Sequence, residues 1–246
     1  ADDNAFLGTG SWFIPGLERP EPIVTDEVFE AAGSNEVGVE GTVRFLRNLP
    51  GFSLLELCRE QWAAEGKTSD YEPLLKQAAS IGTDVSLVDP RAGTFVDAQF
   101  EGDVEERIRT FCERTDQRPP ADEYETTACI LTSLAAGTAI VLEQLIAVAD
   151  ESVERIHLGG GGVRNELFCQ QFANAIGLPV HAGPTEATAI GNLLVQLRSG
   201  GEIDGIDEGR RIVAETFDVT EYEPTDEGEW ASVRERFQDV AERANA

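Results

Sequence analysis

The 246-residue sequence contains no methionine, not even at position 1, where an open reading frame normally begins. The chain starts instead at Ala1, shortly before an apolar, strand-like run. We therefore expect the chain to be a piece of a longer protein.

Basic residues are also scarce, since 19 Lys and Arg face 46 Asp and Glu, a formal net charge of −27. Lysine occurs only as Lys67 and Lys76. Such a charge excludes a nucleic-acid partner and an anionic membrane surface, because phosphates would be repelled. An acidic, lysine-poor surface is typical of proteins that work at high salt, where the self-repulsion is screened. We expect a cytoplasmic protein of a halophile.

Metal-ligating and nucleophilic side chains are few. The cysteines are Cys58, Cys112, Cys129 and Cys169, none in a C-x-x-C pair, and there are two histidines. This set argues against a zinc site and is compatible with a reducing compartment. Carboxylates are too abundant for any of them to be singled out by spacing as a general acid or base.

Long hydrophobic runs are limited to one, from Ala128 to Val148. It is interrupted by Gly137, Glu143 and Gln144, so we expect a buried core helix and no membrane span. The 41% share of hydrophobic residues is enough for one sizeable core.

The first 64 residues predict a hairpin and then a helix. Apolar runs flank Gly8–Ser11, where glycine would allow a positive φ in the turn. Apolar spacing from Gly41 to Ala64 predicts a helix with a bend at Pro50-Gly51.

Strand and helix patterns alternate in the second half, which predicts an α/β fold. Asp103 is a candidate N-cap and Gly177 a candidate helix stop. Further helices are expected at residues 70–80, 103–112, 124–148, 164–176, 186–197, 208–215 and 226–244, strands at 155–158 and 178–180, and a loop at 87–102.

A run of glycines, Gly159–Gly162, lies between a predicted strand and a predicted helix. That position suits a phosphate or a nucleotide, because backbone N–H groups face the helix N-terminus. No Walker lysine follows, and Arg164 stands where a dinucleotide fingerprint needs glycine. Close packing of the strand on the helix explains the run equally well. The hairpin at Gly8–Ser11 is a second possible phosphate cradle or an ordinary β-turn.

Four segments, in this order, resemble the C-terminal half of the FGGY-type carbohydrate kinases, and most closely the rhamnulokinases. They are residues 6–12, 35–48, 160–167 and 177–192. The resemblance covers nearly the whole chain. It implies an α/β, RNase H-like half of an actin-like ATPase fold. Residues 1–246 would be the C-terminal nucleotide-binding domain, and the N-terminal sugar-binding domain would be absent from the chain.

The resemblance also implies the residues of the site. Thr9, Gly10 and Ser11 would lie at the ATP phosphates, Gly160, Gly161 and Asn165 beside the nucleotide, and Asn48 at the sugar. Glu56 stands where the family often has glutamine near ATP. A carboxylate beside a triphosphate is repulsive unless Mg²⁺ intervenes.

By the same resemblance, the complete enzyme would use ATP and Mg²⁺ to convert L-rhamnulose to L-rhamnulose 1-phosphate. The family's catalytic Asp precedes the hairpin, so we expect this chain alone to be inactive. The alternatives are a kinase for another sugar, such as fuculose or xylulose, and a non-catalytic nucleotide-binding fragment.

The acidic surface leads to a first prediction. The chain should be less compact and melt at lower temperature in dilute buffer than in molar KCl, because salt screens the repulsion among carboxylates. Circular dichroism melts at both salt concentrations test this. Equal melting temperatures would contradict the halophile interpretation.

Overall fold

The computed structural model describes residues 4–97 and 103–244. In this part of the chain one mixed sheet has the strand order β3-β4-β2-β1-β6-β7-β8, and β5 pairs with β2 beside that path. The strands β1, β6 and β7 run parallel, and α7 makes the crossover from β6 to β7. The strands are β1 (Asn4–Thr9), β2 (Trp12–Arg19), β3 (Ser34–Val37), β4 (Val43–Leu46), β5 (Leu49–Pro50), β6 (Arg155–Gly160), β7 (Val180–Ala182) and β8 (Thr220–Tyr222).

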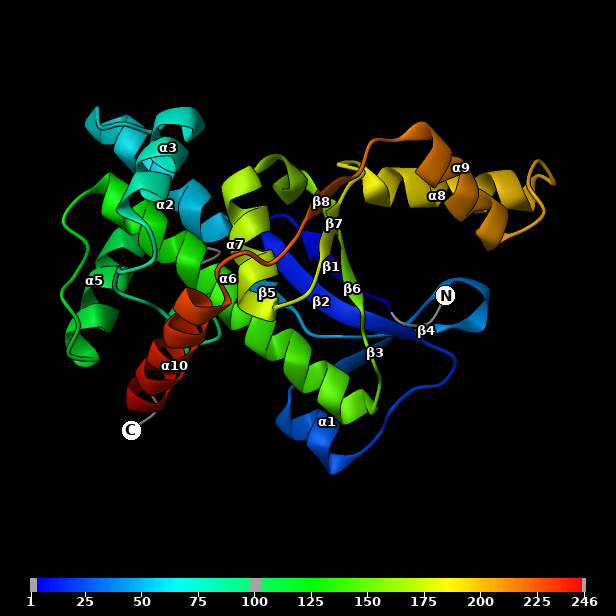
Figure 1. Ribbon diagram of the computed structural model, residues 1–246, viewed down its shortest axis with the longest axis horizontal. Helices are drawn as coiled ribbons and strands as arrows, with labels where there is room; N and C mark the ends of the chain where they lie inside the picture. Colours follow the sequence, from blue (N-terminus) through cyan, green and yellow to red (C-terminus); the bar gives the residue numbers. More distant parts are fainter. Residues whose placement is uncertain (1–3, 98–102, 245–246) are drawn as a thin grey trace.

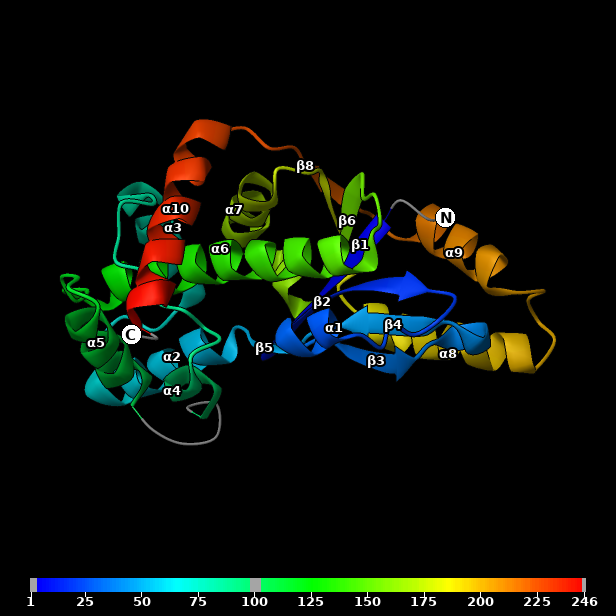
Figure 2. The same ribbon diagram turned by 90° about the horizontal axis from the view of Figure 1, so that it is seen from below.

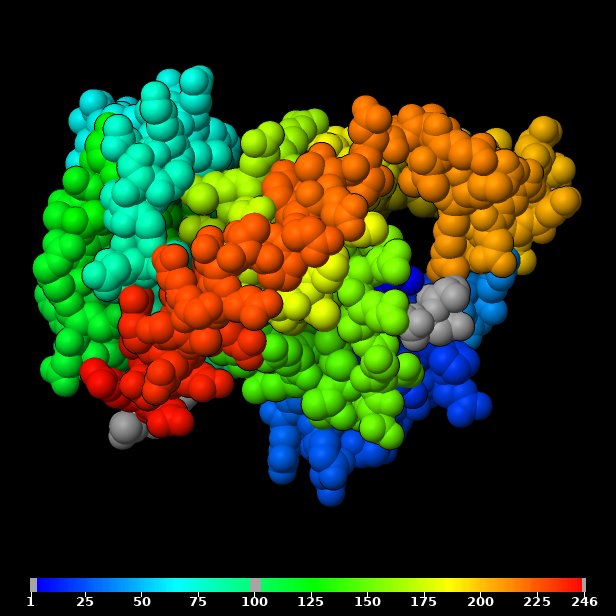
Figure 3. Space-filling model, viewed as in Figure 1, coloured from blue at the N-terminus to red at the C-terminus, as the bar shows by residue number. Residues whose placement is uncertain are grey.

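The helices gather at the two ends of the sheet and on its faces (Figures 1 and 2). At one end lie α2, α3 and α5, and at the other end α8 and α9 form an arm that projects from the body (Figure 3). The helices are α1 (Asp26–Glu30), η1 (Val39–Gly41), α2 (Ser53–Glu65), α3 (Tyr71–Ile81), α4 (Gly93–Val96), α5 (Val104–Arg114), α6 (Glu123–Ala149), η3 (Gly161–Arg164), α7 (Glu166–Ile176), α8 (Ala187–Ser199), α9 (Ile206–Thr216) and α10 (Glu227–Ala244).

The core is organised around α6, which crosses the middle of the molecule (Figure 2). It packs against β2, α3, α7 and α10. Gly137 allows a close approach of α10, because a Cβ there would lie 3.0 Å from Phe237 Cζ. The helix is apolar and long enough to span a membrane, but 83% of its most apolar window is buried inside the protein. The expectation of a core helix is confirmed.

Alternation along the central strands aims one face at α6 and α7. In β1, Ala5 and Leu7 are buried, and in the neighbouring β6 so are Ile156 and Leu158. Successive strand residues point to opposite faces, so these four side chains line the same side of the sheet. This register brings the carboxyl ends of β1 and β6 together, with Gly8 opposite Gly159.

One sequence-based expectation was wrong. Residues 41–50 are not the first part of a helix, because they form β4 and β5, and the helix begins only at Ser53. The spacing of Val43, Leu46 and Leu49 resembled a helical period. The backbone partners of these residues come from the nearby β3 and from β2, which is more than 20 residues away in the sequence, so local periodicity could not reveal the central pairing with β2.

The other expected helices exist, with ends shifted by a few residues. Asp103 caps α5 as expected, since its carboxylate accepts a hydrogen bond from Glu106 N at 2.9 Å. Gly177 ends α7 in the left-handed region, with φ 70°. The expected loop at 87–102 contains the short α4, and its residues 98–102 lie outside the described part, as does Ala1. The strands β3 and β8 were not anticipated.

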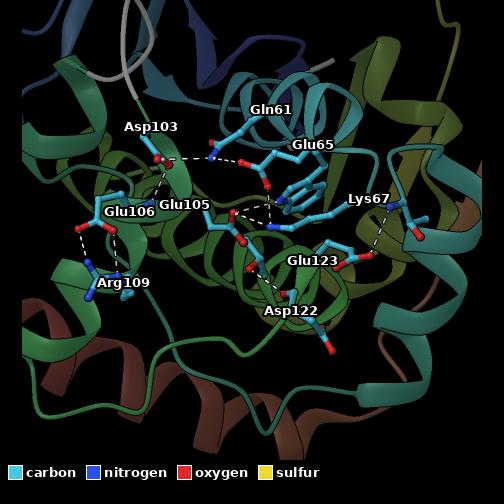
Figure 4. A network of polar contacts seen from close by, with 12 residues as sticks. Gln61, Glu65, Lys67, Asp103, Glu105, Glu106, Arg109, Asp122 and Glu123 are labelled. Carbon is cyan, nitrogen blue, oxygen red and sulfur yellow. Dashed lines mark hydrogen bonds and ion pairs between the residues drawn. The ribbon is translucent and has the colours of Figure 1, made fainter.

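A polar network fastens the C-terminal half of α2 to α5 (Figure 4). Lys67 Nζ lies 2.8 Å from Glu65 Oε2 and 3.7 Å from Glu105 Oε2. The buried indole of Trp62 donates to the same Glu105 carboxylate at 3.2 Å. One of the two lysines, Lys67, therefore helps to join α2 to α5. These contacts fix the C-terminal half of α2.

The hydroxyl of Thr9 joins the end of β1 to the glycine turn after β6. It donates to Gly159 O at 2.8 Å and accepts from Gly162 N at 3.1 Å. The contact leaves no space for a side chain at Gly160 or Gly162. A Cβ at Gly162 would lie 2.5 Å from Thr9 Oγ1, and one at Gly160 would lie 2.2 Å from Thr9 O.

This packing gives a second prediction. Gly162→Ala should destabilise the fold by about 1–3 kcal/mol, because overpacking forces the Thr9 bridge apart. The melting temperature should fall by roughly 2–4 °C for each kcal/mol at this chain length. Gly161→Ala is the matched control, since no atom lies within 4 Å of a Cβ there. Wild-type melting of the Gly162 variant would contradict the prediction.

Candidate nucleotide site

A cavity of about 460 Å³ lies where the hairpin, the glycine turn and two helices meet. Four separate stretches of sequence contribute to its wall. The lining residues are Gly10, Ser11, Phe52, Glu56, Tyr71, Leu75, Gly161, Gly162, Arg164 and Asn165. The size is within the range of small-molecule sites. Of the residues expected at the nucleotide, the cavity brings together Gly10, Ser11, Glu56, Gly161 and Asn165.

The tip of the β1–β2 hairpin forms one end of the cavity. It is docked on the start of α2, where Gly51 N donates to Ser11 O at 2.9 Å and Phe52 N donates to Gly10 O at 3.0 Å. Ser53 Oγ also donates to Ser11 O, at 2.8 Å. The carbonyls are therefore used within the protein. The Ser11 side chain is exposed, and among the described residues its hydroxyl has no partner.

Gly10 is not in the left-handed region, so the hairpin turn does not depend on the positive φ that its glycines would allow. In the glycine turn, by contrast, Gly160 has φ 97°. The conformational freedom of glycine is therefore used at the second turn and not at the first.

Within the glycine run, Gly161 is the glycine whose presence is not explained by backbone conformation or by packing. Its φ is not positive, and a Cβ there would meet no atom within 4 Å. Gly161 lines the cavity. Its neighbours Gly160 and Gly162 must be glycine, because a Cβ at either position would collide with Thr9. A side chain at position 161 would therefore occupy space in the cavity and not in the protein interior.

Asn165 lines the same cavity and carries a buried donor without a protein partner. Its Oδ1 accepts from Phe168 N at 3.1 Å and so caps α7. Asn165 is only 7% exposed, and its Nδ2 has no partner in the described part of the chain. An unpaired buried N–H group costs about 1–3 kcal/mol, so a ligand acceptor here would recover a hydrogen bond.

Glu56 lies on the cavity wall, in a cluster with Arg59 and Tyr71. Arg59 Nη1 donates to Oε1 at 3.0 Å and to Oε2 at 2.9 Å, and the Tyr71 hydroxyl also donates to Oε1. The Arg59 guanidinium stacks 3.7 Å from the Tyr71 ring centroid, and its Nε donates to Ser69 O at 2.6 Å. The charge of Glu56 is thus balanced within the protein.

The remaining expected residues lie outside the cavity wall. Thr9 is buried beneath it, with its hydroxyl engaged by Gly159 and Gly162. Gly160 directly precedes the lining residue Gly161 in the chain and does not itself line the cavity. Asn48 is exposed in the turn between β4 and β5, away from the lining residues.

Several lining residues were not foreseen from the sequence. Phe52, Tyr71 and Leu75 supply the apolar wall, and Arg59 supports Glu56 from behind. The i, i+3 spacing of Glu56 and Arg59 on a helix was the one signal that could have found the pair. The approach of Tyr71 depends on the packing of α3 beside α2, which no local pattern predicts.

The cysteines are buried, and the described residues form no cluster of metal ligands. All four cysteines are free and buried, and burial raises the pKa of each thiol, that of Cys169 to about 12. They are therefore protonated and unreactive near neutral pH. Within residues 4–97 and 103–244, no group of three or more His, Cys, Asp or Glu side chains could hold a metal ion.

Known proteins are similar to this chain in sequence and in fold. Residues 4–200 match the FGGY family of carbohydrate kinases, C-terminal domain. A rhamnulokinase of Bacteroides thetaiotaomicron is 39% identical over 226 residues, which is 92% of this chain and 45% of that protein. The chain therefore spans somewhat less than half the length of this curated relative.

Solved structures agree on the fold. The xylulose kinase of Rhodospirillum rubrum matches with a TM-score of 0.68 at 15% identity, over 98% of this chain and 46% of that one. The glycerol kinase of Plasmodium falciparum, solved with ADP, matches with a TM-score of 0.65 at 10% identity, over 98% and 47%. The architecture is the expected α/β half of an actin-like ATPase fold. Together with the match over residues 4–200, this shows that the chain belongs to the FGGY family of carbohydrate kinases, in its C-terminal domain.

Proposed function

We propose that this chain is the nucleotide-binding half of a kinase that transfers phosphate from ATP to L-rhamnulose, giving L-rhamnulose 1-phosphate. The carrying observation is the 39% identity to a rhamnulokinase over 92% of the chain. In this proposal residues 1–246 are the C-terminal domain, and an N-terminal domain supplies most sugar contacts and the aspartate that activates the sugar hydroxyl.

The cavity has the features that a nucleotide requires. In the proposal, the Ser11 hydroxyl binds a phosphate oxygen beside Gly10, and Thr9 and Gly160 act by holding the hairpin tip and the glycine turn in shape. Gly161 permits close approach of the ligand, and Asn165 Nδ2 donates to it. The open space at Gly161 and the unpaired Nδ2 of Asn165 support this assignment. Asn48 is proposed to contact the sugar from the exposed turn before β5.

Mg²⁺ fits the proposal only as a companion of the nucleotide. The described residues offer no cluster of ligands for a resident metal ion. Mg²⁺ commonly keeps several waters and binds through substrate phosphates. We therefore assign it no ligand from this chain, and its contribution would be to neutralise charge on the phosphates.

The proposal includes a cytoplasmic setting at high salt. It is supported by four free cysteines, which fit a reducing compartment, and by the net charge of −27 with only two lysines. The helix α6, which is long and apolar enough to cross a membrane, lies mostly buried in the core of the protein.

The nucleotide assignment gives a third prediction. Gly161→Val should lower ATP affinity by at least tenfold, because the new side chain would project into the cavity. The melting temperature should stay near that of the wild type, since no atom lies within 4 Å of the new Cβ. Calorimetric ATP titration measures the effect.

Gly228→Val provides a matched control for Gly161→Val, since position 228 in α10 is equally free of close neighbours. It should leave ATP affinity unchanged. Unchanged ATP affinity in the Gly161 variant would refute the site.

The division of labour between domains gives a fourth prediction. The purified 246-residue chain should form no ADP from ATP and L-rhamnulose in a coupled assay. The polypeptide extended by the sequence encoded upstream should turn over L-rhamnulose faster than L-fuculose or D-xylulose. Turnover by the chain alone would contradict the domain assignment, and a preference for another ketose would correct the substrate.

A further inference from the structure

Two histidines lie side by side on the face of the sheet that turns away from α6. His157 on β6 is in register with His181 on β7, which is in register with Glu221 on β8. The residues on either side of His157 are buried in the core, so alternation places this row on the opposite face. The two imidazole ring centroids lie 5.5 Å apart, and His181 Nε2 lies 3.3 Å from Glu221 Oε1. A positive charge on His181 would therefore be balanced, whereas no carboxylate in the described part of the chain pairs with His157.

Two arginines join the α8–α9 arm of Figure 3 to the β2 and β4 side of the sheet. Arg210 Nη2 on α9 lies 2.6 Å from Glu18 Oε2 on β2, and Arg198 Nη1 at the end of α8 lies 3.0 Å from Glu40 Oε1 in η1. Alternation along β2 puts Glu18 on the same face as His157. All four partners in these pairs are at least 36% exposed, and ion pairs between exposed side chains are weak. The docking of the arm should therefore respond to a single added charge.

His157 lies close enough to Arg210 to interact with its charge. The pKa of His157 is lowered first by the partial loss of water around the imidazole and then by the neighbouring His181. Arg155, two residues away on the same strand, and Arg210 lower it further. A proton on His157 thus meets cations from β6, β7 and α9, while the carboxylate of Glu18 is engaged by Arg210.

Two more arginines beside this histidine already have partners. The ring of Phe6, its register neighbour on β1, has its centroid 5.2 Å from Arg44 Cζ, and Arg44 Nη1 lies 3.3 Å from Glu36 Oε2. Arg155 Nη2 lies 3.8 Å from Glu154 Oε2. A proton on the imidazole would therefore add a charge beside arginines whose carboxylates are already in use.

We propose that the α8–α9 arm is an acid-sensitive strap on the sheet, docked while His157 is neutral and released when His157 takes up a proton. The added charge repels Arg210 and finds no carboxylate that is free to balance it. Because docking of the arm lowers the pKa of His157, the docked arm binds a proton less readily than the released arm, and protons favour release. Docking should therefore weaken as the pH falls below about 6.5, the ordinary pKa of histidine. The response needs neither ATP nor a sugar, so it is independent of the proposed function.

Hydrogen exchange read by mass spectrometry tests the strap on the 246-residue chain. The observable is the protection factor of the α9 amides, corrected for the intrinsic effect of pH on exchange, at about pH 5.5 and about pH 7.5. In the wild type it should be lower by about fivefold or more at the acidic pH, because histidine is the side chain that normally takes up a proton in this interval. Protection of the core helix α6 should stay within about twofold, which separates release of the arm from unfolding.

His157→Gln removes the proton acceptor and keeps a neutral, polar side chain. In this variant the protection of α9 should differ by less than about twofold between the two pH values. His181→Gln is the matched control, since the sequence contains only these two histidines and Glu221 balances the charge on His181. It should keep a fall of about threefold or more. Wild-type protection of α9 that does not change with pH, a fall that persists in His157→Gln, or a fall abolished by His181→Gln would overturn the strap.

A second measurement depends on neither histidine variant. Proton NMR of the ring C–H signals gives the pKa of each histidine in the folded chain. Arg210→Gln should raise the pKa of His157, because one of the cations that repel its proton is removed. Arg211→Gln is the control, since the side chain of this next residue on α9 pairs with Glu215 on the same helix, and it should leave that pKa unchanged. Equal pKa values of His157 in the wild type and in Arg210→Gln would contradict the proposed release.

Discussion

The geometry of the cavity depends on one buried hydroxyl. Thr9 Oγ1 bridges Gly159 O and Gly162 N, which are 150 and 153 residues away in the sequence. The bridge holds the end of β1 against the turn after β6, and so holds the hairpin tip opposite Gly161. It also dictates the composition of the turn, because side chains at positions 160 and 162 would collide with Thr9. The residue that shapes the cavity is therefore not one that lines it.

The cavity wall is much less acidic than the protein as a whole. The single carboxylate on the wall, Glu56, is balanced by Arg59, and the α2 N-terminus faces the hairpin end. A second carboxylate, Glu105, is also balanced within the protein. It lies near the Lys67 ammonium and accepts a hydrogen bond from the Trp62 indole, and these contacts join α5 to α2. A chain with a net charge of −27 can thus form a site for an anion, because the Ser11 hydroxyl, the Asn165 amide and the exposed Arg164 guanidinium belong to the cavity wall.

Much of the fold could be predicted where the signal is local. The apolar run that became α6, the cap at Asp103 and the stop at Gly177 each involve residues within a few positions of one another. Residues 43–50 were misassigned because β4 and β5 both pair with β2, a strand that is distant in the sequence. The glycine run was visible in the sequence, but its two explanations could not be separated there. In the structure both apply, since Gly160 and Gly162 serve packing and Gly161 borders the cavity.

The sequence by itself determined the family and the positions of the helices and glycine turns in the second half. It also determined most of the residues that meet at the cavity. These follow from residue order and local periodicity, which a linear chain displays directly. Only the tertiary structure decided which of those residues line the cavity, that the Thr9 hydroxyl is turned inward, and that Arg59 and Tyr71 balance and orient Glu56. Such facts depend on distances between segments that the chain brings together only when it folds, so no spacing along the sequence contains them.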